Sequence, residues 1–358
     1  MKIGILTYHR SHNYGALLQA VALRKVVEQL GHKAYYIDYF PDYHREMYKW
    51  FSIYNFNQQG PRGKIRYLKN CLKRYRFWKM RRDNFLDFQR QFIFPYCLGM
   101  DEEFDVVLYG SDQIWRKQHI INDYNPVYFG KNTITTKKHL SYAASMGELP
   151  NSDKDYRTLK ELLTNIDKIS VREQGLLSLV SSLGYKDTEL VLDPTLLLGK
   201  TEWDSIIPSN RIISEPYCLY YSLIKDSFNE DAIRKFADER GLKFISLLGR
   251  AINKPTIDSR TVDGPEEFIN LIRYADFVFT SSYHGMVFSI IYNRPFYASF
   301  SHNSDRAASL LRTMGLDAHL LNPNSDIPQY QHYNSLCIQK LSPMRVKSIQ
   351  FIKTNIGL

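Results

Sequence analysis

The amino-acid sequence predicts an α/β fold of two Rossmann-like domains that face a cleft. Its 358 residues exceed what a single core usually needs, so two domains are expected. Strand-like and helix-like segments alternate in both halves, a rhythm typical of parallel sheets with crossover helices. Several of the strand-like segments end in polar residues, at the edge where open parallel sheets bind their ligands.

The first half opens with a strand, a helix and a second strand. The strand is expected over Ile3–Tyr8, the helix over Ala16–Leu30 and the second strand over Ala34–Tyr39. Gly31 follows the helix and is a usual stop signal. Later strands are expected at Val106–Tyr109, His139–Ser145, Ile169–Glu173 and Leu190–Thr195. Together these segments predict an N-terminal Rossmann-like domain at residues 1–205.

A second Rossmann-like domain is expected at residues 206–340. The apolar rhythm weakens over residues 201–216, which indicates a linker there. Strands are expected beyond it at Tyr217–Tyr221, Phe244–Leu248, Phe277–Thr280 and Phe296–Ser299. Helices are expected at Asp231–Arg240, from Asp263 through Tyr274 with Pro265 in its first turn, and at Gly285–Tyr292. Residues 341–358 are expected to form a helix that packs back on the N-terminal domain.

The cysteines and the hydropathy of the sequence argue against a metal-binding, a secreted or a membrane-spanning protein. Cys71, Cys97, Cys218 and Cys337 lie far apart and form no cluster with metal-ligand spacing, so reduced thiols and no metal are expected. The N-terminus becomes polar too early for a secretory signal, and no apolar run is long enough to span a bilayer. We therefore expect a cytoplasmic protein that is at most peripheral at the inner face of the cell membrane.

Most of the net charge of +10 comes from residues 62–82, where ten lysines and arginines are interleaved with aromatic and aliphatic residues. We expect a long helix there, inserted in the N-terminal domain at about 61–93. Such a helix could lie on anionic lipid. The same pattern of cationic and apolar residues would also fit a helix that covers the first domain's core with one face and is solvated on the other. No nucleic acid partner is expected, because no RNA- or DNA-binding signature accompanies the charge.

A polar loop, Thr280–Gly285, follows a strand and opens a helix. Backbone N–H groups, including that of Gly285, and the positive end of the helix dipole point at such a loop, which suits a phosphate or carboxylate. Ser281, Ser282 and His284 can add hydrogen-bond donors. A Ser/Thr helix cap beside a structural histidine explains the same residues, and the pattern does not decide between the two.

Arg172 stands near the end of the strand expected over Ile169–Glu173. Its guanidinium offers a planar fork that can hold a carboxylate or a phosphate in two places. A salt bridge with Glu173 or Asp167 is the competing explanation, and the spacing alone favours it.

Two more loops follow strands and are candidates for ligand contacts. The first contains Asn13, Tyr14 and Gly15 at a position where α/β folds bind phosphates, although a plain turn fits a single glycine almost as well. The second, Gly110–Trp115, brings Asp112 together with an indole. Sugars favour such mixtures, because hydroxyls need acceptors and C–H faces stack on rings. A capped turn with Trp115 in the core is the alternative.

These motifs, taken in this order, resemble those of the polysaccharide pyruvyl transferase family. The matching stretches are Ile5–Leu23, Tyr109–Trp115, Ser141–Gly147, Ser170–Glu173, Leu192–Thr195 and Thr280–Pro295. They run from near the start of the chain to about Gly315, so the resemblance covers nearly the whole chain.

The resemblance implies a two-domain fold similar to that of the GT-B glycosyltransferases, with the acceptor on the N-terminal side and the donor on the C-terminal side. The implied donor is phosphoenolpyruvate, without a cofactor. The implied acceptor is a hexose of a polyprenyl-diphosphate-linked oligosaccharide in capsule or exopolysaccharide synthesis. Residues 62–82 would then contact the carrier's diphosphate or an anionic membrane surface.

The family's strand-end arginine falls on Arg172, and its helix-opening histidine falls on His284. The sequence departs from the family at Ser282, because characterised members have an arginine two residues before that histidine. Arg250 or Arg306 could supply the missing charge. We expect His284 to act as the general acid, Arg172 with the 281–282 loop to hold the donor, and Asp112 to accept the sugar proton.

Two other functions stay open. A nucleotide-sugar-dependent GT-B glycosyltransferase of surface polysaccharide synthesis would share the fold, since fold does not fix function. It would need a carboxylate for a ribose, and Glu266 or Glu267 could be one, although a role at a helix N-terminus explains both better. A non-catalytic glycan-binding protein would explain the aromatic residues but not a histidine and an arginine at strand ends.

Overall fold

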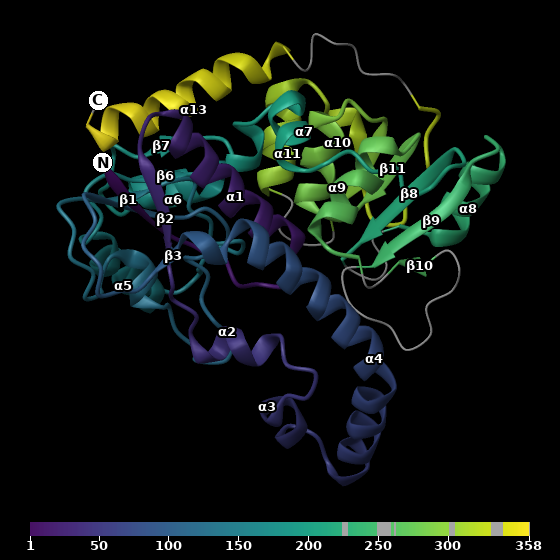
Figure 1. Cartoon of the computed structure of the whole chain (residues 1–358), viewed down its shortest axis with the longest axis horizontal. Helices are drawn as coiled ribbons and strands as arrows, with labels where there is room; N and C mark the ends of the chain where they lie inside the picture. Colours follow the sequence, from purple (N-terminus) through teal and green to yellow (C-terminus); the bar gives the residue numbers. More distant parts are fainter. Residues whose placement is uncertain (224–227, 249–258, 261–262, 301–304, 331–338, 358) are drawn as a thin grey trace.

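The computed structural model describes residues 1–223, 228–248, 259–260, 263–300, 305–330 and 339–357. Over this part of the chain, each half of the sequence forms a parallel β-sheet with helices packed around it (Figure 1). The predicted α/β fold with two Rossmann-like halves is therefore confirmed.

The N-terminal sheet has the strand order β3-β2-β1-β4-β5, and every neighbouring pair is parallel. Its strands are β1 (Lys2–Leu6), β2 (Lys33–Ile37), β3 (Cys97–Leu98), β4 (Val106–Tyr109) and β5 (His139–Ser141). The chain builds one side of the sheet from β1 outward and then returns to place β4 on the other side of β1. The gap between β1 and β4 is therefore the topological switch point of this sheet.

A two-stranded sheet of β6 (Ser170–Val171) and β7 (Glu189–Leu190) continues beyond β5 through isolated parallel bridges. The strands expected around residues 139–145, 169–173 and 190–195 are thus shorter than predicted. One reason is Ala143, whose φ of 51° ends the extended conformation after β5. Another is Asp193, whose side chain caps a 3₁₀ turn at Pro194–Leu196.

The C-terminal sheet repeats the same topology with the strand order β10-β9-β8-β11-β12-β13. Its strands are β8 (Tyr217–Ser222), β9 (Lys243–Leu248), β10 (Ser259–Arg260), β11 (Phe277–Thr280), β12 (Phe296–Ser299) and β13 (Leu320–Leu321), all paired in parallel. Its switch point lies between β8 and β11.

The α-helices of the described residues connect and flank these strands. They are α1 (Tyr14–Gln29), α2 (Asp42–Met47), α3 (Ile53–Asn57), α4 (Pro61–Phe92), α5 (Asp153–Leu163), α6 (Gln174–Ser182), α7 (Lys200–Ile206), α8 (Glu230–Asp238), α9 (Pro265–Tyr274), α10 (Tyr283–Ile291), α11 (Asp305–Met314) and α13 (Leu341–Ile356). None of the helices in the described part of the chain has the length and hydropathy of a membrane-spanning segment.

The linker expected over residues 201–216 begins instead as helix α7. The Glu202 carboxylate accepts from the Gly199 N–H at 3.0 Å and closes the first turn. Trp203 is fully buried and contacts the ring of Phe288 in α10 at 5.0 Å. The sequence did not indicate this helix, because the packing partner of its one large apolar residue lies far along the chain.

The basic segment forms the long helix that the sequence predicts, α4. Its second half is packed, with Phe85, Phe88 and Phe92 buried. Its first half projects from the body together with α2 and α3, at the bottom of Figure 1. We call residues 42–82 of this projection the basic arm.

Helix α13 packs against the N-terminal half. The Lys138 ammonium donates to the carbonyl of Asn355 at 2.7 Å, and the Ser348 hydroxyl accepts from the N–H of Leu192 at 2.9 Å. The chain thus returns to its first domain after the second sheet is complete.

The two halves share one hydrophobic core, in which α1 and α4 pack on α9. Tyr14 lies at its centre, with its ring stacked on Phe85 at 5.2 Å and on Phe268 at 4.7 Å between ring centres. The Tyr14 hydroxyl donates to the carbonyl of Asp263 at 2.8 Å and accepts from Arg81 Nη1 at 2.9 Å. One buried side chain therefore joins α1, α4 and the second domain.

We expect Tyr14→Phe to lower the free energy of unfolding by about 1–3 kcal/mol, because a buried carbonyl and Arg81 lose this partner while the ring stack remains. Urea unfolding followed by circular dichroism measures the change. Tyr35→Phe, on a half-buried side chain of β2, is the matched control and should change the same free energy by less than about 0.5 kcal/mol. Equal effects of the two variants would contradict the tethering role of Tyr14.

Candidate functional site

A cleft lies where the switch points of the two sheets meet. Tyr8, Asn13 and Asp112 reach it from the carboxyl ends of β1 and β4, while Leu223 and the 282–284 segment reach it from β8 and β11. These residues line a cavity of about 260 Å³. Ligands of parallel sheets bind at such points, because the loops on either side diverge there.

Five of the residues that the sequence singled out line this cavity. They are Asn13, Asp112, Ser282, His284 and Arg306. The structure therefore brings together residues from both domains that are up to 293 positions apart in the chain, taken from Asn13 to Arg306 (306 − 13).

His284 enters the cavity from the first turn of α10. The helix begins at Tyr283, two residues before the predicted start, because the Ser282 hydroxyl caps it by accepting from the Gly285 N–H at 3.3 Å. A Cβ atom added to Gly15 would lie 1.9 Å from Nδ1 of His284. A glycine at position 15 is therefore what allows α1 of the first domain to approach the imidazole so closely.

Asp193 lies behind the imidazole. Its side chain is fully buried, and its Oδ2 lies 3.5 Å from His284 Nε2. Burial alone would raise the pKa of Asp193, but His284 and Arg172 lower it far below the ordinary value of an aspartate. Asp193 is therefore an ionised carboxylate that can orient the His284 ring.

Arg172 lies behind the cavity, with only 1% of its side chain exposed. Its Nη1 donates to Asp193 Oδ2 at 2.5 Å, and carboxylate oxygens of Glu173 and Asp112 lie 3.5 and 3.6 Å from the guanidinium. Burial alone would lower the pKa of Arg172, but these three carboxylates raise it above its usual value. The guanidinium thus holds acidic groups of the protein itself, and its contact with a substrate anion stays a prediction.

The competing explanation for Arg172 was an ion pair with Glu173 or Asp167. The structure shows the pair with Glu173, whose pKa burial raises despite the nearby Arg172 and Arg306. Asp167 lies elsewhere and accepts from the backbone N–H of His139 at 2.7 Å.

Arg306 brings a second guanidinium to the site from α11. Its Cζ lies 5.2 Å from the centre of the Tyr283 ring, and it lines the cavity beside Ser282 and His284. No carboxylate of the described residues forms an ion pair with it. Burial and the neighbouring Arg172 lower its pKa, so the charge of Arg306 is poorly compensated. An anion in the cavity would stabilise it.

Two helix N-termini add to this positive potential. The Asn13 side chain caps α1 by accepting from the Ala16 N–H at 3.2 Å, and Ser282 caps α10 in the same way. Both caps line the cavity. The positive ends of two helix dipoles therefore flank the same space, a setting that favours phosphate or carboxylate.

Two aromatic residues that the sequence placed at the site belong to the core. Trp115 is fully buried, donates to the carbonyl of Tyr128 at 2.9 Å and stacks on Phe129 at 5.2 Å. The alternative of a core tryptophan is thus correct. Tyr14 is buried at the domain interface, where its hydroxyl has two protein partners. Neither ring is exposed enough to stack on a sugar.

Two further candidates, Ser281 and Gly285, have contacts that shape the backbone around the site. The Ser281 hydroxyl accepts from the Leu223 N–H at 2.8 Å. A Cβ on Gly285 would lie 2.3 Å from Thr280 Oγ1, so this glycine is required where α10 leaves β11. Both residues therefore have structural contacts within the protein, and their contact with a ligand stays a prediction. Arg250, the other proposed source of the missing charge, lies outside the described residues.

Sequence reasoning missed several residues of the site. Asp193 ends a predicted strand, and the polar strand-end signal that singled out Arg172 could have found it. Tyr8, His44 and Tyr48 also line the cavity, but only tertiary contacts bring α2 over the end of β1. Burial lowers the pKa of His44 to about 4 despite the nearby Asp112, so this imidazole is neutral near pH 7.

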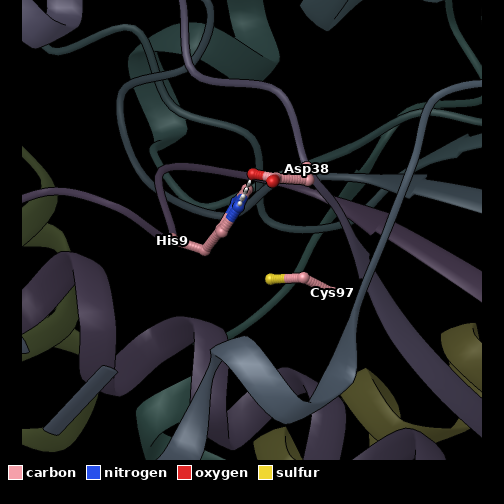
Figure 2. A group of neighbouring side chains, drawn as sticks. All are labelled: His9, Asp38 and Cys97. Carbon is pink, nitrogen blue, oxygen red and sulfur yellow. Dashed lines mark hydrogen bonds and ion pairs between the residues drawn. The ribbon is translucent and has the colours of Figure 1, made fainter. Parts of the chain in front are cut away.

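One cluster of the described residues has ligand atoms close enough for a metal ion: His9, Asp38 and Cys97, whose atoms lie within 4.8 Å of one another. Figure 2 shows the imidazole pointing at the Asp38 carboxylate, 3.5 Å away, with the thiol to one side. The Arg10 guanidinium also binds that carboxylate. Burial and Asp38 raise the pKa of Cys97 to about 12, which keeps the thiol protonated. Within the protein, the Asp38 carboxylate of this cluster is paired with Arg10 and His9.

The sequence was compared with known families and proteins. The profile of the family described as Polysaccharide pyruvyl transferase matches residues 13–304. Among curated proteins, none matches the sequence.

Solved structures of similar shape include three sugar-related proteins. The UDP co-structure of S. aureus MnaA is 11% identical, with a TM-score of 0.49 over 99% of this chain and 89% of that chain. The UDP-GlcNAc 2-epimerase of Methanocaldococcus jannaschii is 10% identical, with a TM-score of 0.48 over 100% and 93%. The glycosyltransferase SnogD of Streptomyces nogalater is 11% identical, with a TM-score of 0.44 over 100% and 99%.

We expect Gly15→Ala to destabilise the protein by about 1–3 kcal/mol, because the added methyl group overlaps the His284 ring at the closed domain interface. Combining it with His284→Ala should restore most of the loss by making room for that methyl group. Gly60→Ala is the control, since a Cβ there meets nothing within 4 Å. Thermal unfolding of the unmodified protein, the two single variants, the double variant and the control measures the coupling, and additive effects at positions 15 and 284 would contradict the contact.

Proposed function

The chain belongs to the polysaccharide pyruvyl transferase family, and from this premise we propose that it transfers the pyruvyl group of phosphoenolpyruvate to a hexose. The product is a cyclic ketal on a lipid-linked oligosaccharide, as needed for a capsule or an exopolysaccharide. The observation that carries the proposal is the pairing of His284 with the ionised Asp193 beside the poorly compensated cation Arg306. That arrangement offers a proton and a positive field to one small anionic molecule.

The reaction requires a proton donor, a nucleophile and an exit for phosphate. A proton adds to the methylene carbon of phosphoenolpyruvate, and a sugar hydroxyl attacks the adjacent carbon and releases its own proton to a base. The C–O bond to phosphate then breaks, and inorganic phosphate leaves with the bonding electrons. A second hydroxyl of the same sugar attacks the resulting oxocarbenium carbon, loses its proton and closes the ring.

His284 is the general acid of this scheme. Its Nε2 lies 3.5 Å from Asp193 Oδ2, and its Nδ1 lies on the side of Gly15. Imidazole is suited to this role because its pKa lies closest to neutral pH. Asp193 is a positioning residue, and Arg172 holds Asp193 in turn.

Arg306 and the N-termini of α1 and α10 form the donor's anion site. Arg306 takes the place of the arginine that other members of the family carry at the position of Ser282. Preorganised cations and N–H groups stabilise the charge of the leaving phosphate without a cost of reorganisation. Asp112, half-buried in the lining of the same cavity, is the base that accepts the proton of the sugar hydroxyl.

The acceptor reaches this cavity from the side of the basic arm. We infer a polyprenyl-diphosphate carrier for the oligosaccharide and a peripheral position at the cytoplasmic face of the membrane, with residues 62–82 against anionic lipid. The cationic and apolar side chains of the arm support this placement, because basic amphipathic helices bind anionic bilayers.

We expect His284→Ala to reduce turnover by a factor of about 100 or more while the fold is kept, because the general acid is lost. Release of inorganic phosphate from phosphoenolpyruvate in the presence of a lipid-linked acceptor measures turnover. His32→Ala, which changes a histidine at the turn before β2, should leave turnover within about twofold. Turnover close to that of the unmodified enzyme in His284→Ala would remove this residue from the mechanism.

We expect Arg306→Gln to raise the KM for phosphoenolpyruvate by about tenfold or more, because a charge-assisted contact to the donor is lost. Arg312→Gln removes an exposed arginine from the same helix and should leave the KM unchanged. Initial rates across a range of donor concentrations measure both. A KM for Arg306→Gln equal to that of Arg312→Gln would show that another residue replaces the family's arginine. A nucleotide sugar that raised the melting temperature where phosphoenolpyruvate did not would favour a glycosyltransferase instead.

A further inference from the structure

The basic arm contains a cavity of about 400 Å³ between α4 and the α2–α3 segment. On one side it is lined by Arg74, Trp78 and Arg81 of α4, and on the other by Lys49 and Trp50 of the turn between α2 and α3. Its volume falls within the range of sites for small molecules, about 300–1,000 Å³.

The two walls of the cavity are held together by specific contacts. The Trp78 indole donates to the carbonyl of Tyr48 at 3.0 Å, and the Tyr67 hydroxyl accepts from the backbone N–H of Ser52 at 3.1 Å. The arm is therefore a folded unit with a defined hollow, and not a single helix extended into solvent.

The lining of the cavity is strongly cationic. Lys49, Arg74, Arg81 and Arg82 contribute to it, and no aspartate or glutamate is among the described residues that line it. The carboxylates that pair with Lys49 and Arg82, those of Glu46 and Asp83, are not part of that lining.

Arg74 contributes a half-buried guanidinium to this wall. Its Nε donates to the carbonyl of Asn70 at 3.3 Å, and none of the carboxylates in the described ranges forms an ion pair with it.

The field of these cations acts on a neighbouring group. His12 lines the same cavity, and burial, with a further contribution from Arg81 and Arg82, lowers its pKa to about 4. Arg81 and Arg82 thus contribute positive potential at the position of His12, in addition to the effect of burial. A multiply charged anion would relieve this repulsion.

The cavity lies next to the catalytic cleft. Met47 and Tyr48 line both cavities, and His12 stands one position before Asn13, which caps α1 in the cleft. A ligand held in the arm therefore lies directly beside the space into which His284 and Arg306 face. The outer surface of the arm exposes large apolar side chains, among them Ile53, Ile65, Leu68 and Leu72.

We propose that this cavity, lined by Arg74, Arg81, Arg82 and Lys49, binds the diphosphate group of a lipid-linked acceptor. The inference rests on the proposed function, since the sugar attached to that diphosphate would extend into the catalytic cleft. The apolar outer surface of the arm then faces the prenyl chain. Guanidinium groups suit this ligand because their planar fork matches phosphate oxygens.

Direct titration tests the site without relying on transferase activity. Inorganic diphosphate and farnesyl diphosphate are titrated by calorimetry into the unmodified protein, Arg74→Gln and Arg76→Gln. Arg76 is the matched control, because it lies on the same helix, is exposed and does not line the cavity. We expect Arg74→Gln to weaken binding of both compounds about tenfold or more, and Arg76→Gln to change it by less than twofold.

The outcomes are distinct. Equal weakening in the two variants would mean diffuse surface charge and would overturn the proposal, as would failure of the unmodified protein to bind either compound. Tighter binding of farnesyl diphosphate than of inorganic diphosphate supports a lipid-linked ligand. Equal affinities for the two compounds would overturn the claim that the ligand is lipid-linked.

The proposed function can fail separately from this site. A protein that binds diphosphate through Arg74 but transfers no pyruvyl group would keep the site and lose the function. A protein that transfers pyruvate but binds diphosphate equally well in Arg74→Gln would keep the function and lose the site.

Discussion

The architecture of the site depends on one buried carboxylate, that of Asp193. An ionised carboxylate without access to water is stable only if cations and hydrogen bonds surround it. Arg172 provides a cation from the first domain, and His284 provides an imidazole from the second. The charge balance at Asp193 is complete only when the two domains meet. Asp193 therefore links the alignment of the histidine to the packing of the two halves against each other.

The two arginines near the Tyr283 ring have different electrostatic surroundings. Arg172 is surrounded by carboxylates, so its charge is compensated by acidic groups of the protein itself. Arg306 has no ion-pair partner among the described residues and faces the cavity, so its charge is available to a ligand. The serine at position 282 fits this division, because it adds no further charge beside the two guanidinium groups. A third guanidinium beside these two would add repulsion that the carboxylates present would have to offset.

The basic arm extends the same electrostatic pattern outward from the cleft. Its cavity shares Met47 and Tyr48 with the catalytic cavity, and both are poor in carboxylates relative to cations. A substrate with phosphate groups at two places would meet cationic side chains in both cavities. Its apolar exposed face has no equivalent on the rest of the described surface, where large apolar side chains are exposed only singly.

The sequence by itself determined the main strands of both sheets, the long basic helix and the helix-opening position of His284. These features follow from periodicity and capping, which act over a few residues and can be read locally. The tertiary structure alone decided that Trp115 and Tyr14 are core residues, that Arg172 serves Asp193 and that Arg306 reaches the cleft. Each of these outcomes depends on which distant segment packs against the side chain, such as α9 on Tyr14 or β7 on the strand before Arg172. Burial and charge compensation are set by those long-range contacts, and local sequence does not contain them.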